Sequence, residues 1–184
     1  FLETEHHDGY FRDQCVFSDA IDIEDNMNVV VNYRNRVKLS YSLNAFLPWE
    51  GYHICFNGTR GRLEHKWEEQ VRVCTDGSVP GALGREGTWI RIYPHWSPAY
   101  EVETWQGEGG HGGGDPVMLR YILDPDHQPP DPYLRAADER AGAWSILTGI
   151  AGNRSIAEGR AIRIDELVPD IGMPDEPPMP SPDE

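Results

Sequence analysis

The sequence lacks the features that mark membrane and nucleic-acid-binding proteins. No apolar run approaches the roughly 20 residues of a membrane-spanning helix, and no signal peptide is recognisable. Basic residues are few, with 16 Lys and Arg against 31 Asp and Glu, for a net charge of −15. Because phosphate groups are bound by clustered basic side chains, this balance argues against nucleic acid and anionic membranes as partners. We expect a cytoplasmic protein.

Cysteine is also scarce. Cys15, Cys55 and Cys74 are odd in number and widely spaced, and no C-x-x-C pair occurs. A cysteine-based zinc site is therefore not expected, and the pattern favours free thiols in a reducing compartment. Cys55 falls in an apolar strand-like stretch, where a buried free thiol would be ordinary.

The chain length of 184 residues is enough for one domain with a hydrophobic core. Because the first residue is Phe1, we expect a fragment, a processed product or part of a longer protein. We expect one domain over residues 1–168. Residues 169–184 hold six prolines, five acidic residues and no basic residue, which is typical of an extended acidic tail.

Much of the first half of the chain alternates between apolar and polar residues, as strands with one buried face do. This alternation over residues 27–33 and 37–45 predicts an antiparallel hairpin. Arg36 is unusual in the link, because tight hairpin turns favour glycine. Further strands are expected at residues 52–56, 62–66, 71–74, 89–93 and 100–105, and short links between them indicate a mostly antiparallel sheet.

The pattern becomes helical near residue 115. Asp115 and Pro116 predict a helix start, with Asp115 as N-cap. A longer Ala-rich helix is expected over residues 136–154, and residues 155–158 have the pattern of a capping box that begins one more turn. The whole predicts an α+β fold, an open and predominantly antiparallel sheet with helices on one face.

Residues 105–116, W-Q-G-E-G-G-H-G-G-G-D-P, contain the dinucleotide-binding pattern G-x-G-x-x-G. The surrounding sequence does not fit a nucleotide site. The preceding strand alternates with acidic residues instead of being apolar on both faces, and Asp115 places a carboxylate where a pyrophosphate would lie. We interpret the tract as a tight loop between sheet and helix that presents His111.

Three stretches, in order, carry a resemblance to a known family. The first leads from Y-S-L-N-A-F at 41–46 to G-T-R-G-R-L-E at 58–64. The second is G-H-G-G-G-D at 110–115, and the third is the Ala-rich run 141–155 followed by E-G-R at 158–160. Together they resemble the C-terminal half of the Gfo/Idh/MocA oxidoreductases, named after glucose–fructose oxidoreductase and inositol dehydrogenase.

The resemblance implies an NAD- or NADP-binding Rossmann domain outside this chain. It implies that this chain shapes the substrate pocket for a sugar, cyclitol or related polyol and builds a dimer or tetramer through its sheet. The family's catalytic E-K-P and D-x-x-x-H motifs are absent, so this chain alone is expected to have neither catalytic nor cofactor-binding residues. The alternatives are a non-catalytic carbohydrate-binding domain, given six Trp and eight Tyr, or a scaffold subunit.

His111 is the first candidate for substrate contact, because neutral imidazole both donates and accepts hydrogen bonds. Its alternative is a surface histidine bonded to nearby groups. Arg12 is a candidate for a carboxylate or sugar hydroxyl, with a local salt bridge as the alternative. Trp49, Glu50 and Tyr52 combine aromatic rings with a carboxylate, which suits a sugar, although core or interface packing explains them equally well.

No metal site is expected. His6, His7 and Asp8 are adjacent in sequence, and neighbouring side chains rarely converge on one ion, so an exposed turn is the better interpretation. The acidic residues between 19 and 25 lack the spacing of a calcium loop and are interpreted as a solvated face.

Overall fold

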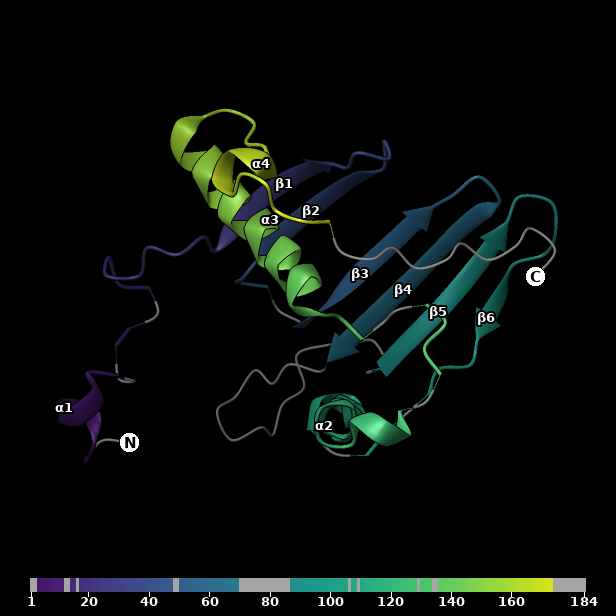
Figure 1. Ribbon diagram of the computed structural model, residues 1–184, viewed down its shortest axis with the longest axis horizontal. Coiled ribbons are helices and arrows are strands. Elements are labelled where there is room, and N and C mark those ends of the chain that lie inside the picture. Colours follow the sequence, from purple (N-terminus) through teal and green to yellow (C-terminus); the bar gives the residue numbers. More distant parts are fainter. Residues whose placement is uncertain are drawn as a thin grey trace. The chain divides into compact units, whose positions relative to one another are not determined.

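The computed structural model describes residues 3–11, 14–15, 17–47, 50–69, 87–105, 107–108, 110–128, 130–133 and 136–173. These residues form two compact units, Phe1–Glu101 and Val102–Glu184. The first unit carries the strands and the second carries the long helices. Figure 1 shows the helices and strands of both units.

The predicted hairpin is confirmed in the first unit. Strands β1 (Asn26–Asn32) and β2 (Lys38–Asn44) pair antiparallel, with Val29 opposite Tyr41. The link between them holds Arg36 at φ 72°, in the left-handed region that glycine adopts more readily. A short helix, α1 (Glu5–Asp8), lies near the start of the same unit, where an exposed turn was expected.

The other strands form a second, separate sheet in the order β3-β4-β5-β6 (Figure 1). Their bounds are Glu50–Asn57, Gly61–Glu69, Gly87–Pro94 and Tyr100–Val102. The strand expected at 100–105 therefore ends early, and the one expected at 71–74 lies outside the described residues. Two antiparallel sheets, one of them open, together with helices confirm the α+β class.

The pairing register gives the second sheet two chemically different faces. Cys55 pairs with Glu64 and Glu64 with Arg91, while Phe56 pairs with Leu63 and Leu63 with Ile92. Since side chains alternate between faces, the register sorts them completely. The apolar face carries Tyr52, Ile54, Phe56, Leu63, His65, Trp67, Ile90 and Ile92, and the charged face carries His53, Cys55, Arg62, Glu64, Lys66, Trp89 and Arg91.

The prediction that Cys55 is buried is wrong. The thiol is exposed, because the register places it on the charged face beside Arg62 and Glu64 instead of on the apolar face beside Ile54 and Phe56. An apolar sequence neighbourhood does not decide burial in a strand, because adjacent residues point to opposite faces.

The second unit begins with the glycine tract. A 3₁₀ turn, η1 (Gly110–Gly113), leads into helix α2 (Gly114–Leu123), and a second 3₁₀ turn, η2 (Pro125–His127), follows. The prediction of Asp115 as N-cap is wrong. Gly113 occupies that position, because the Asp115 carboxylate accepts a hydrogen bond from His111 instead of from the first turn of the helix.

The Ala-rich helix, α3, extends over Glu139–Glu158, and its N-cap Asp138 accepts a hydrogen bond from the Ala141 N–H at 2.8 Å. The capping box predicted at 155–158 is wrong, because these residues form the last turn of α3, which ends at Gly159. Ser155 Oγ donates to the Arg160 carbonyl at 2.6 Å and so closes the helix end. The next turn is α4 (Ile164–Leu167).

Few described side chains are fully buried. Leu147 and Ala151, on one stripe of α3, are buried, and Trp144 donates through Nε1 to the Gly172 carbonyl at 2.8 Å, which holds the segment after α4 along α3. Residues 174–184 of the predicted acidic tail lie outside the described residues. Within the described part of the chain, no helix is both long and apolar enough to cross a membrane.

Candidate functional site

His111 lies at the centre of the glycine tract with an unusual backbone. Its φ and ψ are 51° and 45°, a left-handed conformation that costs a non-glycine residue about 1–2 kcal/mol. Its ring is 87% exposed, and Nδ1 lies 2.8 Å from Asp115 Oδ1. Because a carboxylate only accepts hydrogen bonds, this contact places a hydrogen on Nδ1, and in the neutral imidazole Nε2 is then an exposed acceptor.

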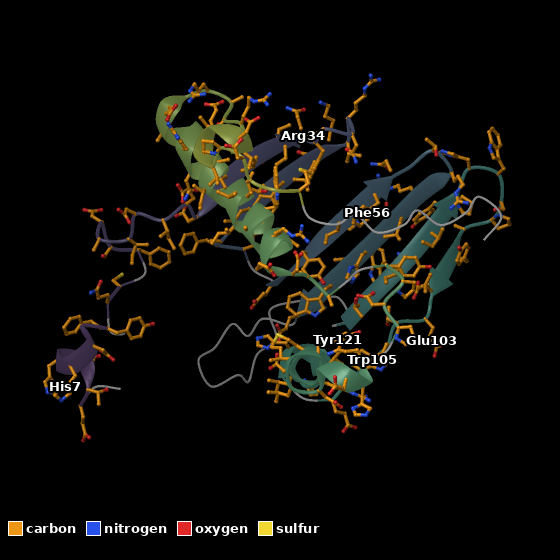
Figure 2. All side chains as sticks on the ribbon, in the orientation of Figure 1. His7, Arg34, Phe56, Glu103, Trp105 and Tyr121 are labelled. Carbon is orange, nitrogen blue, oxygen red and sulfur yellow. The ribbon has the colours of Figure 1, made fainter. Side chains whose placement is uncertain are left out.

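The glycine tract folds against itself. A Cβ added to Gly113 would lie 2.6 Å from the Gly107 Cα, and one added to Gly107 would lie 2.2 Å from the ring of Trp105. The Trp105 side chain is labelled in Figure 2. The close backbone approach that these glycines permit is therefore internal to the loop. The Asp115 carboxylate stands in the first turn of α2, the place where a helix of a dinucleotide site would meet a pyrophosphate.

Tyr52 belongs to an aromatic cluster on the apolar face, which we call the Tyr52 cluster and which comprises Tyr52, His65 and Trp67. The Tyr52 ring lies edge-on to His65 with centroids 5.2 Å apart and tilted to Trp67 at 5.6 Å. His65 Nε2 is 2.9 Å from Thr88 Oγ1, which fixes the imidazole from the neighbouring strand. Such a platform offers apolar ring area with polar groups at its edge, as sugar recognition requires.

Glu50 lies two residues before Tyr52 and therefore on the same face of β3, so the predicted pair of a carboxylate and an aromatic ring shares one surface. Glu50 is exposed and faces Glu69 across the sheet. Two carboxylates side by side favour a cationic or hydroxyl-rich neighbour over an anionic one. The other two candidates, Arg12 and Trp49, lie outside the described residues.

Sequence reasoning missed His65 and Trp67 as neighbours of Tyr52. The signal was present in the short link between β3 and β4, because a tight hairpin fixes the register and the register pairs Tyr52 with Trp67. Pairing the residues of the two strands one by one from Asn57 and Arg62, next to the link, places Tyr52 opposite Trp67 and close to His65.

A shallow, open depression lies between β5 and β6 on the first unit. It is lined by Arg91, Tyr93, Ala99, Tyr100 and Glu101, and Arg91 Nε lies 3.1 Å from Glu101 Oε2. Its charged groups are already paired, so it contributes little that would hold a ligand. The Tyr52 cluster and the His111–Asp115 pair are the stronger candidates.

One curated protein is clearly similar to this chain. The protein named "Putative oxidoreductase YteT", from Bacillus subtilis (strain 168), is 37% identical over 162 residues, which cover 86% of this chain. The matched part is 35% of that protein, so the chain spans about a third of the length of the curated relative it matches. No protein-family model matches the chain, and no solved structure matches it. The chain is thus similar to part of a protein named as an oxidoreductase.

Proposed function

We propose that this chain is the substrate-binding and oligomerisation part of an NAD(P)-dependent oxidoreductase of the Gfo/Idh/MocA kind. The observation that carries the proposal is the 37% identity to an oxidoreductase through 86% of the chain. The three stretches at 41–64, 110–115 and 141–160 support the narrower family assignment. The substrate class that we infer is a sugar, cyclitol or related polyol.

The proposal places the nicotinamide cofactor in a part of the protein outside this chain. The acidic strand before the glycine tract and the Asp115 carboxylate in the first turn of α2 support this placement. When bound there, NAD or NADP would exchange a hydride with the substrate. In this proposal, the residues of this chain bind and orient the substrate. None of the described residues is assigned a catalytic role.

Two groups are suited to a polyol, and we treat each separately. The rings of the Tyr52 cluster offer an apolar surface for the C–H face of a sugar ring. His111 Nε2, exposed because Nδ1 is held by Asp115, accepts a hydrogen bond from a substrate hydroxyl. The strained backbone at His111 supports a functional role, because such strain persists where a side chain has to be held in place.

The test is a kinetic comparison of full-length enzymes. NAD and NADP are offered with a panel of sugars, cyclitols and polyols, and the reduced nicotinamide is followed by absorbance. With the best substrate, we expect His111→Asn to lower kcat/KM by about 3–10-fold, the value of one lost hydrogen bond. Asparagine tolerates the left-handed backbone, so the fold is kept.

The matched control is His127→Asn. His127 is also exposed and also contacts a neighbouring carboxylate, with Nδ1 2.7 Å from Asp124 Oδ1, but its position after α2 has no proposed contact with substrate. It should leave kcat/KM unchanged. Equal effects of the two variants would contradict the proposed contact between His111 and the substrate. Absence of any NAD(P) binding by the full-length protein would refute the oxidoreductase proposal.

A sugar that binds to the full-length protein without turnover would instead favour the carbohydrate-binding alternative. The Tyr52 cluster is the observation that supports this second candidate. Tyr52→Ala should then abolish the binding measured by calorimetry, because stacking area is lost.

A further inference from the structure

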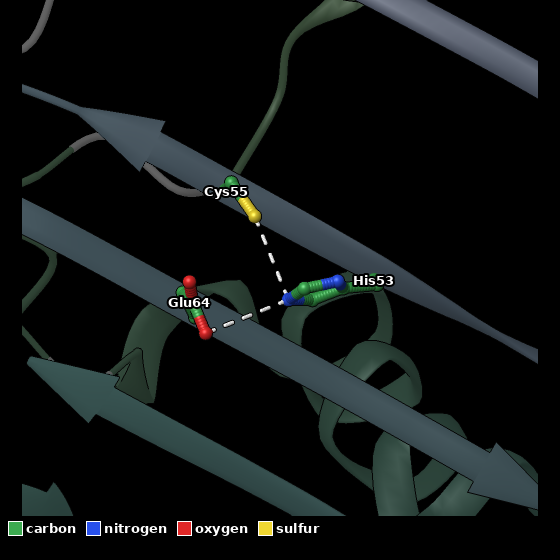
Figure 3. Close-up of side chains that lie close together, drawn as sticks. All are labelled: His53, Cys55 and Glu64. Atoms are coloured by element: carbon green, nitrogen blue, oxygen red, sulfur yellow. Dashed lines mark hydrogen bonds and ion pairs between the residues drawn. The ribbon is translucent and has the colours of Figure 1, made fainter.

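The charged face of the second sheet brings together a histidine, a cysteine and a glutamate that are not neighbours in sequence (Figure 3). His53 Nε2 lies 3.5 Å from Cys55 Sγ and 3.8 Å from Glu64 Oε2. The sulfur, the imidazole nitrogen and a carboxylate oxygen all lie within 4.8 Å of one another. They offer three different ligand types, and each is used by transition metals in proteins.

The backbone dictates this convergence. His53 and Cys55 are two residues apart on β3 and therefore share a face, and the register sets Glu64 of β4 directly opposite Cys55. The Trp89 ring on β5 packs beside the His53 ring, with centroids 6.0 Å apart, and limits how the imidazole can turn. The three donors are thus held by paired strands, which position a site more firmly than a loop does.

We propose that His53, Cys55 and Glu64 form a zinc-binding site. Around a tetrahedral zinc ion with bonds of about 2.0–2.3 Å, ligand atoms lie about 3.3–3.6 Å from one another. The sulfur-to-nitrogen distance of 3.5 Å already meets this requirement, and the nitrogen-to-oxygen distance of 3.8 Å nearly does. Small side-chain rotations would bring the Cys55 sulfur and the Glu64 oxygen, which lie within 4.8 Å of each other, to the same separation.

Arg62 is the group that a metal would have to displace. Its Nη2 lies 2.8 Å from Cys55 Sγ, its Nε lies 2.6 Å from Glu64 Oε1, and its Nη1 lies 2.8 Å from Asn57 Oδ1. Only the contact with sulfur conflicts with a metal, because Glu64 offers its other oxygen, Oε2, to the site. The two remaining hydrogen bonds keep the guanidinium satisfied and hold the carboxylate in place.

Charge and hardness favour zinc over magnesium or calcium. A thiolate and a carboxylate balance the two positive charges of the ion and leave the Arg62 guanidinium as the net positive charge beside the site. The soft sulfur ligand selects against hard cations. Binding replaces the thiol proton, which is released to solvent. With three protein ligands and an exposed imidazole, water completes the coordination.

The site departs from the expectation that this chain has no metal site. That expectation rested on the missing C-x-x-C spacing, which describes ligands supplied by turns and loops. On paired strands, ligands converge through an i, i+2 pair and a cross-strand partner instead.

The experiment measures metal binding to the full-length protein, so its result does not depend on enzyme activity. Cobalt(II) is titrated first, because a thiolate ligand gives a sulfur-to-cobalt charge-transfer band and tetrahedral geometry gives visible d–d bands. Zinc is then added to displace the cobalt, and zinc bound after dialysis is counted by mass spectrometry. We expect one zinc per chain and a charge-transfer band that zinc abolishes.

Three variants remove one ligand each, namely Cys55→Ser, His53→Gln and Glu64→Gln. Cys55→Ser should abolish the charge-transfer band, and each variant should weaken zinc binding by at least about tenfold. The controls are Cys15→Ser, which removes another exposed cysteine, and the double variant His6→Gln with His7→Gln, which removes the adjacent histidines of α1. Both controls should keep the metal.

Alkylation of the wild-type protein gives a second measurement that requires no variant. Iodoacetamide should modify Cys55 at least about tenfold more slowly with zinc than without it, whereas Cys15 should be unaffected. Three results would each overturn the proposal. The charge-transfer band could persist in Cys55→Ser, zinc could be lost equally from the control variants, or the rate of Cys55 alkylation could be the same with and without zinc.

Discussion

Single residues show where the backbone of this chain is most constrained. Among the residues that the structure describes, Arg36, His111 and Asp170 are the non-glycine residues at positive φ. Arg36 closes a hairpin where glycine is the usual choice, and its strain is local to the turn. His111 combines the same strain with an exposed ring held by Asp115, and this combination makes it the better functional candidate.

Gly61 provides a stability prediction at the residue scale. It begins β4 at φ 155°, and a Cβ there would lie 2.3 Å from the Tyr93 carbonyl oxygen on β5. Because backbone cannot give way as a flexible side chain does, Gly61→Ala should destabilise the protein by at least about 2 kcal/mol. The thermal midpoint should fall by about 4 °C or more.

Gly58→Ala is the matched control for that variant. It lies in the same hairpin link, and its Cβ would meet only the Gly61 carbonyl oxygen, at an ordinary 3.7 Å. Its effect should stay within about 1 kcal/mol. Equal losses of stability from the two variants would show that the close approach of β4 and β5 at Gly61 does not exist.

At the scale of elements, ion pairs connect the end of α3 to α4. Glu158 accepts from Arg154 Nε at 2.5 Å and from Arg160 Nε at 2.7 Å, and Arg160 also reaches Glu166 at 3.0 Å. The hydrogen bond from Arg154, followed by the one from Arg160, lowers the pKa of Glu158. Arg160 and then the Arg163 N–H lower the pKa of Glu166.

This network predicts how helix stability depends on pH. A carboxyl group whose pKa is lowered by folding stabilises the fold at pH values above its unfolded pKa. That contribution is lost as the pH falls from about 4.5 through the folded pKa. The Ala141 N–H, and then Arg140, lower the pKa of the N-cap Asp138 in the same direction. As the pH is lowered past about 4.5, the thermal midpoint should therefore decrease. Far-ultraviolet circular dichroism measures this midpoint.

Arg160→Met tests the contribution of the network. It removes the partner shared by Glu158 and Glu166, so the fall in midpoint between neutral and acid pH should become smaller. Arg120→Met on α2 is the control and should keep the full pH dependence. An Arg160→Met protein with the wild-type pH profile would contradict this prediction.

At the scale of the whole molecule, the exposed apolar surface indicates an interface. Tyr52, Ile54 and Phe56 on the apolar face of β3 are 43%, 42% and 61% exposed. The first unit contains no described helix longer than four residues that could cover this face. An apolar strip of this kind is typical of surfaces that contact further protein.

We expect the Phe56 end of the apolar face to bury against a second copy in a homodimer, which leaves the Tyr52 cluster, four residues away along β3, accessible to a substrate. Phe56→Lys places a charge on this face and should convert the dimer into a monomer in light scattering of the full-length protein, since a buried unpaired charge is costly. Asn57→Lys, one residue away on the opposite face of β3, is the control and should remain dimeric. A wild-type protein that is strictly monomeric would contradict the homodimer.

The sequence itself predicted the local structure well in segments with a clear strand-like or helical hydrophobic periodicity. Alternation over 27–33 and 37–45 identified the β1–β2 hairpin, and the Ala-rich run identified α3. The ends of helices were predicted less well, because Asp115, Ser155 and Glu158 bind groups four or five residues away instead of capping the first turn of a helix. A polar side chain near a helix end has several possible hydrogen-bond partners, and the sequence pattern does not show which of them it binds.

The sequence by itself thus determined the α+β class and the hairpins. These depend on interactions between residues close together in the chain, which a short segment already specifies. Only the tertiary structure decided that the tract packs on itself, that Tyr52 lies beside Trp67, and that Cys55 is exposed beside His53 and Glu64. The first depends on positive backbone φ angles within the tract. The other two depend on strand register, since a shift of one residue would move every side chain of a strand to the opposite face.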